Sequence, residues 1–143
     1  MAMWYETSVT YDKMMDNGSV RKVTEKYLVD SLSFAEAEAR TTEERKPFIS
    51  GDFDVRAAKR TKIVEIFGDN EADRFYLAKV AFITIDEKTA AEKRTVSQIL
   101  VGAKDFDEAL QIFKDGMKDT MADFELVSLA ETQIMQVYPA KLA

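Results

Sequence analysis

Hydrophobic and polar residues alternate along residues 3–15, with tyrosine and valine side chains on one side and acidic or hydroxyl side chains on the other. A period of two predicts a half-buried strand. The next segment, DNGS (16–19), predicts a hairpin turn, because Asn and Gly tolerate positive φ. Alternation then resumes over residues 20–30, which predicts the returning strand.

A helix is predicted after this hairpin. In SFAE (33–36), Ser33 is an N-cap and Glu36 follows three residues later, which is the pattern of a capping box. Pro47 predicts the end of the helix, since proline cannot continue it. The stretch DFDVRAAKRTKIVEIF, residues 52–67, then predicts one further strand.

The second half of the chain repeats the first. DFDVRAAKRTKIVEIF aligns with DFELVSLAETQIMQVY (123–138) at an offset of 71 residues. LVDSLSFAEA (28–37) matches LVGAKDFDEA (100–109), and WYETSVTYD (4–12) matches FYLAKVAFI (75–83). Three matches in the same order, at nearly one offset, indicate an internal duplication.

The local signals of the second half agree with this duplication. Its predicted elements are strands over 74–85, 92–101 and 123–138, a turn over 86–90, and a helix capped by DFDE (105–108). The sequence therefore predicts one α+β domain, residues 1–143, built from pseudo-repeats 3–68 and 74–139. Each repeat is a ββαβ unit, and the expected sheet is mainly antiparallel with both helices on one face. The strand order is left open.

A basic cluster distinguishes the first repeat. It comprises Arg56, Lys59, Arg60 and Lys62, which align with Val127, Ala130, Glu131 and Gln133 of the second repeat. The fold therefore does not require these charges. One interpretation is a solvated outer face of the sheet. The other is an anion site, with Arg56, Arg60 and Lys62 on one side of the strand and joined by Lys93 and Arg94, because guanidinium groups suit phosphate and carboxylate.

An excess of apolar residues distinguishes the second repeat. The predicted strands 74–85 and 123–138 carry hydrophobic residues on both sides, whereas two short helices can cover only one face of a sheet. Either these strands are central and the chain covers them, or their second face is an oligomer interface.

The composition excludes several kinds of catalytic, metal and binding sites. The chain lacks cysteine and histidine, which excludes Ser–His–Asp, Cys–His and His–zinc sites; carboxylate-only metal or hydrolase sites stay open. A net charge of −6 argues against non-specific binding to duplex DNA or anionic membranes. We find no signal-peptide pattern and no apolar run that could span a bilayer, so a cytoplasmic protein is expected. No cofactor, metal or catalytic residue is predicted.

Three segments carry a family resemblance: KVTEKYLVDSLSFAEAEAR (22–40), AFITIDEKTAAEKRTVSQILV (81–101) and DTMADFELVSLAETQIM (119–135). They resemble a family of small, functionally uncharacterised proteins from Bacteroides-type bacteria and their phages and mobile elements. The resemblance implies an intracellular setting and a link to phage biology. It supplies no activity, cofactor or site residue.

The leading hypothesis from the sequence is a non-enzymatic binding protein of phage or mobile-element biology. Its ligand would be a small anion or a nucleotide, for example a nucleotide signal of host defence that the protein sequesters. The alternatives are an accessory protein for single-stranded nucleic acid, and a protein-binding or structural oligomer that uses the apolar face of the second repeat. A carboxylate-only enzyme is the least favoured hypothesis.

Overall fold

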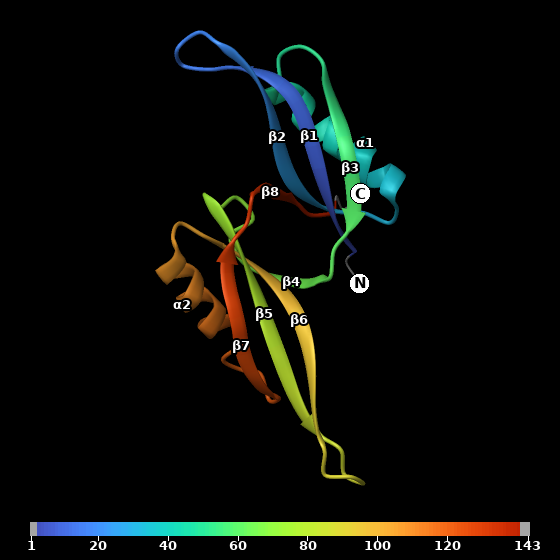
Figure 1. Cartoon of the computed structure of the whole chain (residues 1–143), viewed down its shortest axis with the longest axis vertical. Coiled ribbons are helices and arrows are strands. Elements are labelled where there is room, and N and C mark those ends of the chain that lie inside the picture. Colours follow the sequence, from blue (N-terminus) through green and yellow to red (C-terminus); the bar gives the residue numbers. More distant parts are fainter. Residues whose placement is uncertain (1–2, 141–143) are drawn as a thin grey trace. The chain divides into compact units, whose positions relative to one another are not determined.

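The computed structural model describes residues 3–140, and the chain divides into two compact units (Figure 1). The first unit combines the chain up to Thr61 with the segment from Gln133 onward, and the second unit is Lys62–Thr132. In the first unit lie β1 (Trp4–Met14), β2 (Val20–Asp30), α1 (Phe34–Arg45), the 3-10 turn η1 (Lys46–Phe48), β3 (Phe53–Arg60) and β8 (Ile134–Tyr138). In the second unit lie β4 (Ile63–Gly68), β5 (Arg74–Ile85), β6 (Glu92–Ala103), α2 (Phe106–Gly116) and β7 (Asp123–Glu131).

Each unit is built on a sheet of four strands. The order is β3-β1-β2-β8 in the first unit and β4-β6-β5-β7 in the second. Neighbouring strands are antiparallel except for the pairs β2–β8 and β4–β6, which are parallel. The predicted α+β class with mainly antiparallel pairing is therefore confirmed. The prediction of one sheet with both helices on one face is wrong, because each unit has its own sheet and its own helix.

The two long strands predicted over 52–67 and 123–138 are both interrupted. The first divides into β3 and β4, and the second into β7 and β8, which lie in different sheets. Both interruptions begin at a threonine. Thr61 donates its N–H and its hydroxyl to the carbonyl of Trp4, and Thr132 donates the same two groups to the carbonyl of Phe75. Each repeat thus gives its last strand to the unit formed mainly by the other repeat.

The predicted local signals are present in the structure. Gly18 has a φ of 82° in the DNGS turn, a backbone conformation that favours glycine. Ser33 and Asp105 cap the two helices by accepting from the backbone N–H groups of Glu36 and Glu108. Both glutamates reach back to a backbone N–H just before the cap, which completes two capping boxes.

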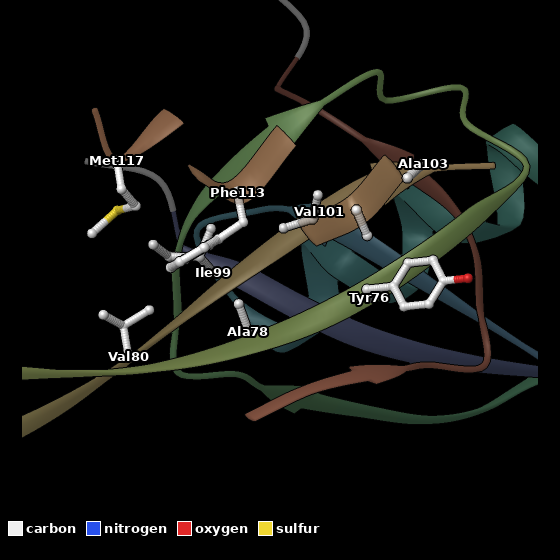
Figure 2. Packing of buried hydrophobic residues seen from close by; sticks show 9 residues of the cluster. Tyr76, Ala78, Val80, Ile99, Val101, Ala103, Phe113 and Met117 are labelled. Carbon is white, nitrogen blue, oxygen red and sulfur yellow. The ribbon is translucent and has the colours of Figure 1, made fainter. Parts of the chain in front are cut away.

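The core of the second unit is apolar and lies between α2 and one face of its sheet (Figure 2). Phe113 is only 2% exposed and packs between the rings of Phe67 and Phe124, with centroids 6.3 Å away in each case. The corresponding place in the first unit is polar. There the buried hydroxyls of Thr7 and Thr41 lie 2.9 Å apart in a hydrogen bond between β1 and α1.

This threonine pair gives a first testable result. Replacing Thr41 by valine should lower the free energy of unfolding by about 1–2 kcal/mol, because the buried Thr7 hydroxyl then has no partner. Replacing both residues by valine should recover part of this loss, since no polar group remains unsatisfied. Urea denaturation of the two single variants and the double variant measures the difference. Strictly additive losses would contradict the expectation.

Candidate functional site

Each sheet has one face that carries its helix, called here the helix face, and one face that does not, called the open face. In the first unit the helix face is marked by the contact between Thr7 and Thr41 and by the ring contact between Tyr5 and Phe34. In the second unit it is marked by Tyr76, Ala78 and Val80, which pack with residues of α2. Because side chains alternate along a strand, the register places every other residue on the open face.

The basic cluster of the first repeat does not lie on one side of one strand. The register between β1 and β3 shifts between Ser8 and Val9, and Arg56 is the extra residue of this β-bulge. Beyond the bulge, Lys59 pairs with Glu6 on the open face, whereas Arg60 pairs with Tyr5 on the helix face. Strand alternation alone predicted the reverse, with Arg56 and Arg60 together and Lys59 opposite.

The other predicted basic residues lie elsewhere. Lys62 begins the second unit, while Arg60 ends β3 in the first. Lys93 and Arg94 stand at the start of β6, where they pair with Thr84 and Ile83. The structure therefore divides the five predicted anion-binding residues between two units, and the sequence hypothesis that they form one site remains a prediction.

Carboxylates form ion pairs with some of the basic residues in and around this cluster. Arg56 lies 3.7 Å from Asp54. Glu6 bridges two lysines on the open face, with Lys26 at 3.7 Å and Lys59 at 3.6 Å. Arg56 also lines a shallow depression of about 130 Å³ whose other charged residues are Asp12, Lys22, Asp52 and Asp54. Acidic groups outnumber basic ones there, which disfavours an anionic ligand.

The open face of the second unit has a different character. Val96 on β6 pairs with the buried Ala81 of β5, and its side chain is 58% exposed. Val127, the bulge residue of β7, is 53% exposed, and Ile85 at the end of β5 is 70% exposed. Among these residues Arg94, which pairs with Ile83, and Glu125, which pairs with Ala81, form an ion pair of 3.0 Å.

Matched positions of the two units show how far their open faces have diverged. Both bulges occur at the same place in the repeat, after Ser8 and after Lys79. In the repeat alignment Val127 corresponds to Arg56, Val96 to Thr24, and Ile83 to Asp12. The open face of the second unit therefore has apolar residues at three positions that are polar or charged in the first unit, although Lys79, Gln98 and Ser128 lie on the same face. The fold tolerates either kind of residue at these positions, so the apolar ones are not required for folding.

A polar cluster lies on the helix face of the first unit. The Tyr27 hydroxyl donates to Glu25 at 3.1 Å, and the guanidinium of Arg45 lies 4.7 Å from the centroid of the Tyr27 ring. Burial raises the pKa of Tyr27 above its usual value; the positive charge of Arg45 lowers it in part, and Glu25 adds to the rise. Burial also raises the pKa of Tyr11, with a further contribution from Glu25.

These raised pKa values predict a loss of stability in alkali. The unfolded chain releases the tyrosine proton near pH 10, while the folded protein still holds it. The contribution of Tyr27 is therefore fully present below about pH 10 and is lost as pH rises toward its folded pKa. Denaturation at pH 9 and pH 11 should show this fall in the free energy of unfolding. The free energy of unfolding of Tyr27→Phe should fall less steeply between these two pH values. An equal slope would contradict the assignment of this fall to Tyr27.

A second depression, of about 280 Å³, lies in the second unit beside the segment that joins the two repeats. Its lining includes Asp69, Glu71, Asp73 and Glu108, together with Lys104, which forms an ion pair with Glu108 at 3.7 Å. Within residues 3–140, no group of three or more carboxylates is arranged to hold a metal ion. No helix in the same part of the chain is long and apolar enough to cross a membrane.

Comparison with known proteins gives a family without a described activity. The family model "Domain of unknown function (DUF4494)" matches residues 3–140, and the chain belongs to this family. No curated protein and no solved structure matches the chain.

Sequence reasoning missed the residues at which the chain passes between units and those that hold β8. Thr61 and Thr132 mark the passage, and their recurrence in otherwise divergent segments was the available signal. Arg40 and Arg45 of α1 bind the end of β8. Their replacement by Ile112 and Met117 in the second repeat was the corresponding signal, since the fold itself does not require these arginines.

Proposed function

We propose that this protein is a non-enzymatic binding module that acts as a homo-oligomer, assembled through the open face of its second unit. The observation that supports it is the contrast between matched positions, where Val96 and Val127 replace Thr24 and Arg56. Exposed apolar residues grouped on one sheet face are typical of an interaction surface. A solvated face has no need of them, as the first unit demonstrates.

A second copy of the chain is the partner that this face fits. A two-fold contact brings the same surface of both copies together, so the surface must complement itself. The open face of the second unit meets this condition, because the oppositely charged Arg94 and Glu125 lie among its exposed apolar residues. These charges already neutralise each other, and a two-fold axis would also bring each arginine of one copy toward the glutamate of the other.

The test replaces Val96 by aspartate and measures molar mass by sedimentation or light scattering. Wild-type protein should have the mass of a dimer, and Val96→Asp the mass of a monomer, because a buried, unpaired carboxylate opposes association. Thr24→Asp is the matched control, since it adds the same charge at the equivalent place of the first unit; it should remain dimeric. A wild-type monomer at micromolar concentration would refute the proposal.

The nucleotide hypothesis makes a different prediction, which the same protein tests. A ligand that binds only the folded state raises the melting temperature. Since acidic residues surround Arg56, we expect nucleotides and inorganic phosphate to leave the melting temperature unchanged. A rise that Arg56→Ala abolishes would instead support an anion site in the first unit.

The biological setting is proposed on the resemblance alone. It places the module inside the cell, in the phage or mobile-element biology of Bacteroides-type bacteria. Fractionation of cells that express the tagged chain tests the location, and recovery of the tag in the cytoplasmic fraction is expected.

A further inference from the structure

Arg45 of α1 recognises a side chain of β8. Its Nη1 donates to the hydroxyl of Tyr138 at 3.0 Å, and its guanidinium lies 4.7 and 4.8 Å from the ring centroids of Tyr27 and Phe48. Tyr138 is only 7% exposed, and its ring lies 5.9 Å from that of Tyr27. The interaction depends on the tyrosine hydroxyl, so a phenylalanine in the same place would leave the arginine without this acceptor.

Arg40 of the same helix binds the backbone of β8. Its Nη1 donates to the carbonyl of Asp30 at 3.1 Å and to that of Tyr138 at 3.4 Å, and its Nη2 donates to the carbonyl of Pro139. Only 12% of the Arg40 side chain is exposed. Arg40 thus joins the ends of β2 and β8 whatever their side chains are, while Arg45 selects the hydroxyl.

The side chains around the parallel strand of the second unit, β4, differ from those around β8. Ile112 and Met117 stand where the first unit has Arg40 and Arg45, and Phe67 near the end of β4 stands where β8 has Tyr138. The Phe67 ring packs so closely on Gly116 that a Cβ there would lie 2.7 Å from it. Ile112 and Met117 offer no guanidinium to a tyrosine hydroxyl in the second unit, and a phenylalanine offers no hydroxyl to Arg45 in the first.

We propose that β2, Arg40 and Arg45 form an acceptor site for an extended segment ending in Val-Tyr, which β8 fills within the chain and β8 of a second copy fills by strand exchange. β4 (IVEIFG) and β8 (IMQVY) have similar apolar patterns, so backbone pairing alone does not distinguish them. The hydroxyl of Tyr138 distinguishes β8 from β4. Strand addition combines main-chain hydrogen bonds with such side-chain selection. This site lies in the first unit and does not depend on the proposed dimer face.

The test uses the full-length chain with Val137→Asp. Val137 is 2% exposed, so an aspartate there opposes docking of β8 and vacates the acceptor site. A synthetic peptide of residues 132–140 (TQIMQVYPA) should bind this variant and raise its melting temperature. The same peptide with phenylalanine in place of tyrosine should bind about tenfold more weakly, the loss expected for one hydrogen bond to a charged group. Arg45→Met added to Val137→Asp should abolish the preference between the two peptides.

Equal affinity of the two peptides, or no binding of either, would overturn the acceptor site. If Val137→Asp does not fold, denaturation of Tyr138→Phe, Arg45→Met and the double variant decides instead. The site requires that Tyr138→Phe destabilise the wild-type chain but barely affect Arg45→Met, whereas additive losses exclude it.

Exchange between two copies has a test of its own. Fluorescently labelled wild-type chain should form a complex with folded Val137→Asp during size-exclusion chromatography. If the variant binds the peptide but forms no such complex, exchange between copies is refuted.

Discussion

Gly102→Ala should lower the free energy of unfolding by about 3 kcal/mol, at the upper end of what overpacking of a core costs. A Cβ at this position would overlap the carbonyl oxygen of Asp69 and would lie 3.0 Å from the Cβ of Ala72 and 3.2 Å from Cε1 of Phe75. The first of these neighbours is backbone, so it cannot move aside as a flexible side chain could. The first repeat has Asp30 at the equivalent place, which shows that the glycine is a requirement of the second unit alone.

Gly18→Ala is the matched control. Gly18 has a φ of 82°, but no atom lies within 4 Å of the position that a Cβ would occupy, so its replacement costs only the left-handed backbone penalty of about 1–2 kcal/mol. Urea denaturation of both variants measures the two losses. A loss at Gly102 no greater than that at Gly18 would show that the segment around Asp69 moves aside to accept the methyl group.

Phe113→Ala should cost about 4 kcal/mol, because it removes the buried ring between α2 and the sheet and leaves a cavity. The ring contacts Phe67 of β4 and Phe124 of β7 as well as the buried cluster of the second unit. Its loss should therefore weaken the whole second unit. Amide hydrogen exchange should show reduced protection in β5 and β6.

Protection in β1 and β2 serves as the internal comparison, since these strands belong to the first unit. Lys114→Ala, on the exposed side of the same helix, is the matched variant and should change stability by less than about 0.5 kcal/mol. Equal loss of protection in both units would show that they unfold together. A small loss of stability would mean that the neighbouring rings collapse into the cavity.

The elements that the sequence predicted correctly depend on contacts between neighbours along the chain. Alternation placed β5 over residues 74–85, and the structure begins and ends that strand at the same residues. The capping boxes at Ser33 and Asp105 were equally predictable, because each is closed by a residue three positions away. The internal duplication was visible for the same reason, since both copies keep these local signals.

The faces of the strands were harder to predict. The assignment of Arg56 and Arg60 to one side assumed strict alternation, and a bulge at Arg56 reverses the side of every residue that follows. A bulge depends on the partner strand, here the pairing of Ser8 with Ala57 and of Val9 with Val55. No residue within the segment itself indicates the bulge.

The chain's local pattern thus specifies its strands, helices, turns and repeats, as well as the contrast between a basic segment in one copy and an apolar one in the other. Only the folded arrangement shows that β4 and β8 leave their own repeats and that the basic residues are divided between two units. The physical reason is that β4 and β8 have similar backbone-pairing capacity and similar apolar patterns. Each strand is held in its unit by contacts between distant residues, such as Arg45 with Tyr138 and Phe67 with Gly116.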